Sequence, residues 1–200
     1  MKSTRKRFIR HTLAALLGLG LIPKLFWGRG KEVPMSVSTV SSNNSGTSGI
    51  TLPTTRPLGN TGIQVTPLGF GASRTQEPAV LKAALDKGIT FIDTGRSYAN
   101  GQNEVMIGKT LKGIRQQYVI QSKIKIDREG PSTRPEAIRS QMEKSLQESL
   151  KALQTDYIDV MLLHGIREEE VIRNDTIRKV FEEMKASGAI RACGFSSHIN

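Results

Sequence analysis

The chain has 200 residues, with 29 lysines and arginines, 18 acidic residues and a formal net charge of +11. Residues 1–31 hold eight basic side chains and no acidic one, whereas residues 32–200 hold 21 basic and 18 acidic side chains. The body of the chain is therefore close to charge balance, which argues against a nucleic-acid partner. A single cysteine, Cys193, excludes an intramolecular disulfide framework and a cysteine-rich metal cluster, and we expect no metal site. Cys193 lies in an apolar stretch and is expected to be a small buried core residue.

Residues 1–30 have the pattern of an export signal or a membrane anchor. A basic segment, residues 2–10, precedes a mostly apolar segment, residues 12–26. The apolar segment is shorter than the roughly 20 residues that a helix needs to cross a membrane. Residues 4–10, Thr-Arg-Lys-Arg-Phe-Ile-Arg, resemble a twin-arginine signal with Lys6 in place of the second arginine.

This pattern predicts an exported protein that is periplasmic or membrane-anchored, and a cytoplasmic one if the signal does not function. Residues 1–27 could contact a membrane in the anchored form. Residues 31–55 are rich in Ser, Thr, Asn and Gly and are expected to form a flexible linker, because they have too little apolar surface to offset the entropy of ordering. Residues 56–200 are expected to form the folded domain.

Residues 56–200 alternate between strand and helix patterns. Two short segments around a glycine-containing turn predict a β-hairpin over 56–65. Short runs of apolar residues predict five further strands, over 67–71, 89–93, 118–124, 157–163 and 192–197. Apolar residues at helical spacing predict helices over 78–87, 103–112, 133–153 and 175–187. Thr133 followed by Glu136 predicts a capping box at the start of the third helix.

The repeated strand–helix order predicts right-handed βαβ units and a parallel sheet, and so the α/β class. The order alone is compatible with a doubly wound sheet and with an eight-stranded barrel. After the first of these five strands, Gly69-Phe70-Gly71 is followed by Ala72-Ser73-Arg74. This departs from the Gly-x-Gly-x-x-Gly pattern and argues against the usual dinucleotide-binding turn.

Ionisable side chains stand at the ends of three consecutive predicted strands: Asp93, Lys123 and His164. Tyr98 follows in the loop after the first of these strands. Each residue has an ordinary structural explanation, as a helix cap, a lysine that reaches solvent, a satisfied core histidine or a surface aromatic. In a parallel barrel, however, the carboxyl ends of all strands open on one face, where active sites are built. The coincidence therefore favours a site.

These four side chains suit proton donation to a carbonyl group. A free tyrosine keeps its proton up to a pH of about 10, and a nearby ammonium group favours the phenolate and makes the proton easier to give. Asp93 can hold Lys123 in place, and His164 can orient the substrate oxygen. Tyr98 can then protonate the alkoxide as hydride reaches the carbon.

The segments around these residues resemble the aldo-keto reductase family. The matching stretches lie within residues 56–200 and are 58–65, 68–71, 84–94, Tyr98, 107–112, 121–123, 145–153, 156–159, 163–164, 188–191 and 194–197. The resemblance implies a (β/α)8 barrel of the TIM type whose base is closed by the hairpin. It also implies NADPH-dependent reduction of a small aldehyde or ketone to an alcohol, or the reverse reaction.

The resemblance implies particular site residues. The catalytic set would be Asp93, Tyr98, Lys123 and His164. Ser196 would contact the nicotinamide amide of NADPH, and Ser197 stands beside it where many members of the family have asparagine. The ending Ser196-Ser197-His198 also resembles a branch that carries a C-terminal iron–sulfur module, whose cysteines this sequence lacks.

The predicted barrel is incomplete, because five strands after the hairpin are three fewer than a (β/α)8 barrel needs. In the family, the missing part supplies much of the cofactor site. A truncated sheet has two open edges, through which the chain could self-associate. Two functions therefore stay open: an NADPH-dependent carbonyl reductase, and a non-catalytic truncated remnant or membrane-tethered interaction domain.

Overall fold

The computed structural model describes residues 55–127 and 133–198. The predicted export signal, residues 1–30, and the predicted linker up to residue 54 lie outside the described residues. Within the described ranges, no helix is both long enough and apolar enough to cross a membrane.

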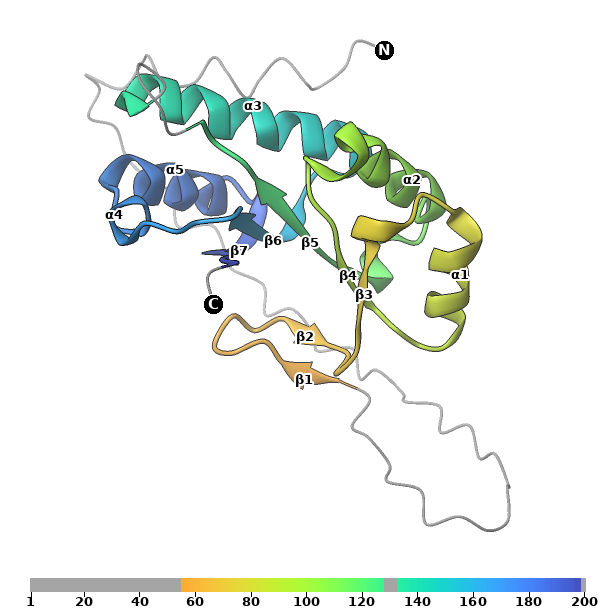
Figure 1. The fold of residues 1–200 in the computed structure, drawn as a ribbon. Coiled ribbons are helices and arrows are strands. Elements are labelled where there is room, and N and C mark those ends of the chain that lie inside the picture. Colours follow the sequence, from red (N-terminus) through yellow and green to blue (C-terminus); the bar gives the residue numbers. More distant parts are fainter. Residues whose placement is uncertain (1–54, 128–132, 199–200) are drawn as a thin grey trace, which may run out of the picture. The chain divides into compact units, whose positions relative to one another are not determined.

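A five-stranded parallel sheet forms the centre of the described part (Figure 1). Its strands lie side by side in chain order: β3 (Gly69–Gly71), β4 (Phe91–Asp93), β5 (Val119–Ile124), β6 (Ile158–Leu163) and β7 (Ile190–Phe195). Each strand pairs in parallel with the next strand along the chain. A doubly wound sheet reverses its strand order at a switch point, whereas a barrel wall keeps the chain order. The observed order is therefore that of a barrel wall.

An antiparallel hairpin precedes the sheet, with β1 (Arg56–Pro57) paired to β2 (Gln64–Val65). Ile63 and Val65 of the hairpin are buried against Val160 of β6 and Ala192 of β7. The hairpin therefore covers part of one face of the sheet and leaves the other face to the helices. The predicted parallel strands and the predicted N-terminal hairpin are both confirmed.

Within the described residues, five α-helices connect successive strands of the sheet: α1 (Pro78–Asp86), α2 (Gln102–Thr110), α3 (Pro135–Leu153), α4 (Glu169–Ile172) and α5 (Asp175–Ala186). The long helix α3 packs against both α2 and α5. The predicted N-cap position, Thr133, is wrong, because α3 begins at Pro135 with Arg134 at its N-cap. The Arg134 side chain makes no capping hydrogen bond. Proline suits the first helical position, because its fixed φ is close to the helical value and an N–H at that position would have no partner within the helix.

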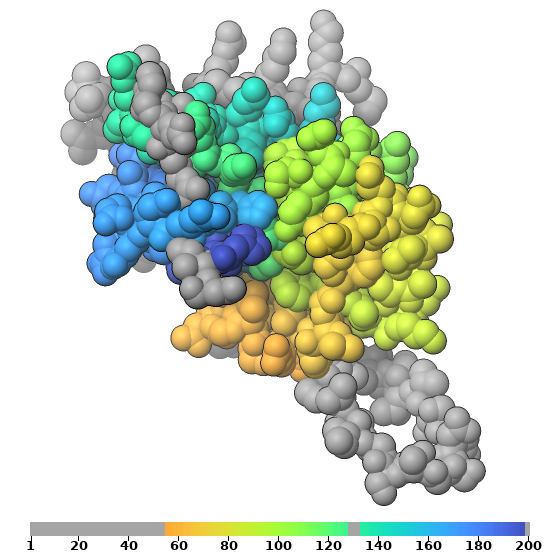
Figure 2. Space-filling model, viewed as in Figure 1, coloured from red at the N-terminus to blue at the C-terminus, as the bar shows by residue number. Residues whose placement is uncertain are grey.

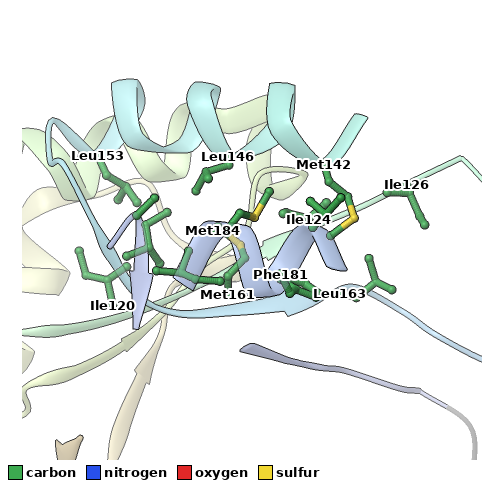
Figure 3. Close-up of a cluster of buried hydrophobic side chains, with 14 of the residues drawn as sticks. Ile120, Ile124, Ile126, Met142, Leu146, Leu153, Met161, Leu163, Phe181 and Met184 are labelled. Carbon is green, nitrogen blue, oxygen red and sulfur yellow. The ribbon is translucent and has the colours of Figure 1, made fainter. Parts of the chain in front are cut away.

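The main core fills the space between the sheet and helices α3 and α5 (Figure 3). In β5, Ile120 and Ile124 point into this core, where they meet Leu146 of α3 and Met184 of α5. Lys123 directly precedes Ile124, so its side chain points to the opposite face, where it is hydrogen-bonded to Asp93 of β4. Strand alternation thus sends Ile120 and Ile124 toward the helices and Lys123 to the other face of the sheet.

Helices α2 and α3 approach closely at Gly108. A Cβ atom built on Gly108 would lie 2.5 Å from the carbonyl oxygen of Ala152 and 2.6 Å from the carbonyl carbon of Leu153. Both atoms belong to the α3 backbone. The contact therefore requires glycine at this position.

Strands β3 and β7 are the edges of the described sheet. Phe195, at the end of β7, is 52% exposed, and Cys193 is exposed as well. The predicted burial of Cys193 is wrong, because apolar neighbours in sequence bury a residue only when another element covers its strand. Figure 2 shows the blue end of the described chain at the surface of the molecule.

Candidate active site

Strands β4, β5 and β6 carry the predicted site residues at their carboxyl ends. Asp93 is the last residue of β4, Lys123 is the penultimate residue of β5, and His164 directly follows β6. The parallel register pairs Asp93 with Gln121 and Lys123 with Leu162. The three ionisable side chains therefore stand at the carboxyl-terminal end of the sheet, because the strands run parallel.

Lys123 is held by two short hydrogen bonds. Its ammonium Nζ donates to Asp93 Oδ1 at 2.6 Å and to the carbonyl oxygen of Thr94 at 2.7 Å. Asp93 Oδ1 also accepts a hydrogen bond from Gln121 Nε2 at 2.6 Å. Lys123 is only 5% exposed. A buried ammonium group is stable only when it is paired, so these acceptors fix both the position and the charge of Nζ.

Tyr98 lies next to this charge and next to His164. The centre of the Tyr98 ring is 4.8 Å from Lys123 Nζ and 5.8 Å from the centre of the His164 ring. The two rings meet edge to face, at an angle of 83°. The structure therefore brings together all four residues that the sequence predicted as catalytic, from three strand ends and one loop.

The surroundings of His164 disfavour its protonated form. Partial burial lowers the pKa of His164, and the nearby positive charges of Lys123, His198 and Lys125 lower it further, whereas Asp93 acts in the opposite direction. The Oγ atom of Ser97 lies 3.4 Å from His164 Nδ1. If the serine hydroxyl donates to Nδ1, the ring carries its hydrogen on Nε2 and can donate it to an acceptor.

Ser196 and Ser197 follow β7 at the same end of the sheet. The Ser196 hydroxyl oxygen accepts a hydrogen bond from the backbone N–H of Gly165 at 3.2 Å. Ser197 is exposed, and the next residue, His198, has its ring centre 6.0 Å from that of His164. The two serines thus stand close to the four predicted catalytic residues. Among the described residues, no three His, Cys, Asp or Glu side chains are grouped to hold a metal ion.

Two buried polar residues of α2 were missed by the sequence analysis. Asn103 Oδ1 accepts from Thr94 Oγ1 at 2.7 Å, and Asn103 Nδ2 donates to the carbonyl oxygens of Ala72 and Thr75, each at 2.6 Å. Asn103 therefore ties the loop after β3 to the loop after β4. One signal was present in the sequence: position 103 shares a helix face with the apolar residue Ile107 four positions later.

Glu104 is the second missed residue, and none of its surface is exposed. Its Oε2 accepts from Arg96 Nη1 at 2.6 Å, and its Oε1 accepts from Ser122 Oγ at 2.6 Å. Burial raises the pKa of Glu104, while the hydrogen bond from Ser122 and the charge of Arg96 act against the rise. The Glu104 carboxyl group lies between the loop that carries Tyr98 and the strand that carries Lys123.

Comparisons with known proteins match this architecture. The model of the aldo/keto reductase family matches residues 67–199. Aldo-keto reductase YhdN of Bacillus subtilis is 33% identical over 153 residues, which are 70% of this chain and 46% of that protein. The chain thus spans about half the length of the curated relatives it matches.

Two solved structures share the fold. The holo form of an aldo-keto reductase from Bacillus halodurans superposes with a TM-score of 0.61 at 34% sequence identity, over 72% of this chain and 50% of that one. An aldo-keto reductase from Klebsiella pneumoniae in complex with NADPH superposes with a TM-score of 0.55 at 32% identity, over 68% and 46% of the two chains. Because the family model matches two thirds of the length of this chain, the chain belongs to the aldo/keto reductase family.

Proposed function

We propose that this protein reduces a small aldehyde or ketone to the alcohol, or runs the reverse reaction, with NADPH as the hydride source. The observation that carries the proposal is the Tyr98 ring beside the buried ammonium of Lys123, 4.8 Å from ring centre to Nζ. Membership of the family and the NADPH complex of the Klebsiella pneumoniae relative support the same reaction class.

Lys123 prepares Tyr98 to give a proton. A phenol that protonates an alkoxide is left as a phenolate, and a positive charge nearby stabilises that anion. Asp93 and the carbonyl oxygen of Thr94 keep the ammonium in place, so the stabilisation needs no rearrangement during the reaction. In this proposal Tyr98 is the acid, Lys123 stabilises the phenolate that Tyr98 becomes, and Asp93 orients Lys123.

His164 orients the carbonyl group. A neutral imidazole can donate one hydrogen bond, whereas a protonated ring would compete with Tyr98 as the acid. The Tyr98 and His164 rings meet edge to face, and in this proposal one carbonyl oxygen accepts hydrogen bonds from both side chains. Two donors on one oxygen polarise the carbonyl group and stabilise the negative charge that develops there.

The residues present fit one part of a nicotinamide cofactor. Ser196 accepts from the Gly165 N–H through its oxygen, which leaves its own hydroxyl hydrogen to donate to an amide carbonyl. Ser197 offers a second, exposed hydroxyl beside it. Ser196 and Ser197 would therefore hold the nicotinamide amide. When bound, NADPH would supply the hydride that reaches the carbonyl carbon.

The test uses the 200-residue chain. We expect saturable binding of NADPH, followed by its fluorescence, and loss of NADPH absorbance that depends on an added aldehyde or ketone. Lys123→Met should abolish carbonyl-dependent oxidation of NADPH. Lys109→Met, which removes an exposed charge from α2, should oxidise NADPH as the unaltered chain does. Absence of both NADPH binding and carbonyl-dependent turnover in the folded chain would overturn the proposal.

The edge strand β7 favours a second candidate function, a non-catalytic interaction domain. Its last residue, Phe195, exposes 52% of its surface, and a groove beside it is lined by Ile172 and Phe181. An open strand edge next to apolar surface is able to pair with another chain. This function predicts concentration-dependent self-association in sedimentation, weakened by Phe195→Ser, in a chain that does not bind NADPH.

Export through residues 1–30 is a separate proposal that rests on the sequence alone. Fractionation of cells that express the full chain tests it. The protein should be found in the periplasm or the membrane fraction, and Arg5→Lys with Arg7→Lys should retain it in the cytoplasm. A wholly cytoplasmic distribution of the unaltered chain would contradict export.

A further inference from the structure

The residues directly after Tyr98 form an unfavourable turn. Ala99, Asn100 and Gly101 have φ angles of 48°, 51° and 84°, so three consecutive residues adopt the left-handed conformation. Residues with a Cβ atom adopt this conformation rarely, and it persists only where surrounding contacts hold it. The turn lies between β4 and α2 (Figure 1) and directly follows Tyr98.

An ion pair closes this turn. Arg96 stands before Tyr98 and Glu104 stands after the turn, and Arg96 Nη1 donates to Glu104 Oε2 at 2.6 Å. A Cβ atom built on Gly101 would lie 1.0 Å from Arg96 Nη2. The guanidinium group therefore occupies the space inside the turn, and its path to Glu104 requires glycine at position 101.

The same pair is anchored to the strand that carries Lys123. Glu104 Oε1 accepts from Ser122 Oγ at 2.6 Å, and Ser122 precedes Lys123 in β5. The backbone N–H of Arg96 donates to the carbonyl oxygen of Lys123 at 3.3 Å. Arg96 Nη1 also reaches the carbonyl oxygen of Glu148 in α3 at 3.4 Å. The turn is thus tied to β5 and to α3 through one buried ion pair.

We infer that Arg96 and Glu104 are positioning residues, which form a latch that holds Tyr98 beside Lys123. Without the latch, the left-handed turn has no charge pair to close it and relaxes, and the Tyr98 ring leaves the ammonium. The catalytic meaning of this latch rests on the proposed function, because there Tyr98 is the acid. The position of the Tyr98 ring beside Lys123 depends on the latch whether or not Tyr98 is the acid.

The tyrosine rings report on the latch directly. The chain has only three tyrosines, so ring carbon-13 NMR signals of the labelled full chain can be assigned with single Tyr→Phe variants. Glu104→Gln keeps the shape of the side chain and removes its charge. Arg96→Met removes the guanidinium group. Both variants should shift and broaden the Tyr98 signal and leave the Tyr157 signal in place.

A second buried ion pair supplies the matched control. Arg115 Nη2 donates to Asp159 Oδ2 at 2.7 Å, and the Arg115 guanidinium lies 4.3 Å from the centre of the Tyr157 ring. Asp159 also accepts from Arg191 Nη1 at 2.6 Å, so Asp159→Asn weakens two ion pairs away from Tyr98. The variant should lower stability and shift the Tyr157 signal but not the Tyr98 signal. A general loss of packing would move both signals in every variant.

The inference is overturned if the Tyr98 signal stays in place in folded Glu104→Gln or Arg96→Met, or if Asp159→Asn moves it as much. Should Glu104→Gln not fold, Arg96→Met carries the test, because the Arg96 side chain is 21% exposed. In an active protein, both latch variants should lower kcat about tenfold and leave KM nearly unchanged. If the NMR result holds and Tyr98→Phe keeps full activity, the proposed function fails and the latch stands.

Discussion

Gly108→Ala should destabilise the protein, although alanine is normally the better helix residue. The added methyl group would lie 2.5 to 2.8 Å from three backbone atoms of α3, all nearer than real Cβ contacts. Backbone atoms near the end of a 19-residue helix cannot turn aside as a flexible side chain can. Helices α2 and α3 would therefore have to separate by several tenths of an ångström.

The magnitude follows from two opposing effects. Overpacking a well-packed interface costs about 1 to 3 kcal/mol. Replacing glycine with alanine inside a helix returns up to about 1 kcal/mol. Because the clash is with backbone, we expect the upper part of the overpacking range and a net loss of about 1 to 2 kcal/mol in the free energy of unfolding. For a domain of this size, such a loss lowers Tm by about 2 to 8 °C.

Urea unfolding followed by circular dichroism measures this loss, and Gly71→Ala is the matched control. Gly71 has no heavy atom within 4 Å of its built Cβ position, and its φ is not in the left-handed region. Gly71→Ala should therefore stay close to wild type. A Gly108→Ala variant as stable as Gly71→Ala would refute the reasoning that α2 and α3 are in close backbone contact.

Two further predictions concern titration and capping. The proton NMR signal of His164 should titrate below the ordinary histidine range, because burial and the charge of Lys123 lower its pKa. Lys123→Met should move the pKa of His164 upward. An ordinary titration midpoint in the wild-type protein would contradict the effect of burial and of the Lys123 charge. Because the folded-state pKa is lowered, the neutral ring adds stability above a pH of about 6.5, and this contribution is lost as pH falls below it. Asn174→Ala should cost about 1 kcal/mol in urea unfolding, since its side chain accepts from the N–H groups of Thr176 and Ile177 at the start of α5; an unchanged free energy of unfolding would show that this cap adds nothing.

The strands and helices could be predicted because each has a strong local signal. In β6, Ile158 to Leu163 is a nearly unbroken apolar run, as a strand buried on both faces requires. The grouping of the candidate site residues could be predicted for a related reason. Once the strands are parallel and in chain order, Asp93, Lys123 and His164 must reach the same edge, whatever the sheet packs against.

Three features could not be predicted because they depend on distant partners. Glu104 resembles an exposed residue in the first turn of a helix until Arg96 and Ser122 fold against it. Cys193 resembles a core residue until its strand becomes an edge. The left-handed turn after Tyr98 has only a partial signature: Asn100 and Gly101 are residue types that adopt this conformation readily, whereas Ala99 is not.

The central claim is that Tyr98 gives the proton, and Tyr98→Phe tests it most directly. The variant keeps the ring and removes only the hydroxyl group, so NADPH binding should stay within about twofold of wild type while kcat for carbonyl reduction falls by about 100-fold or more. Tyr118→Phe, which removes a phenol from the partly buried Tyr118, should keep full turnover. Carbonyl reduction by Tyr98→Phe at the wild-type rate would contradict the account.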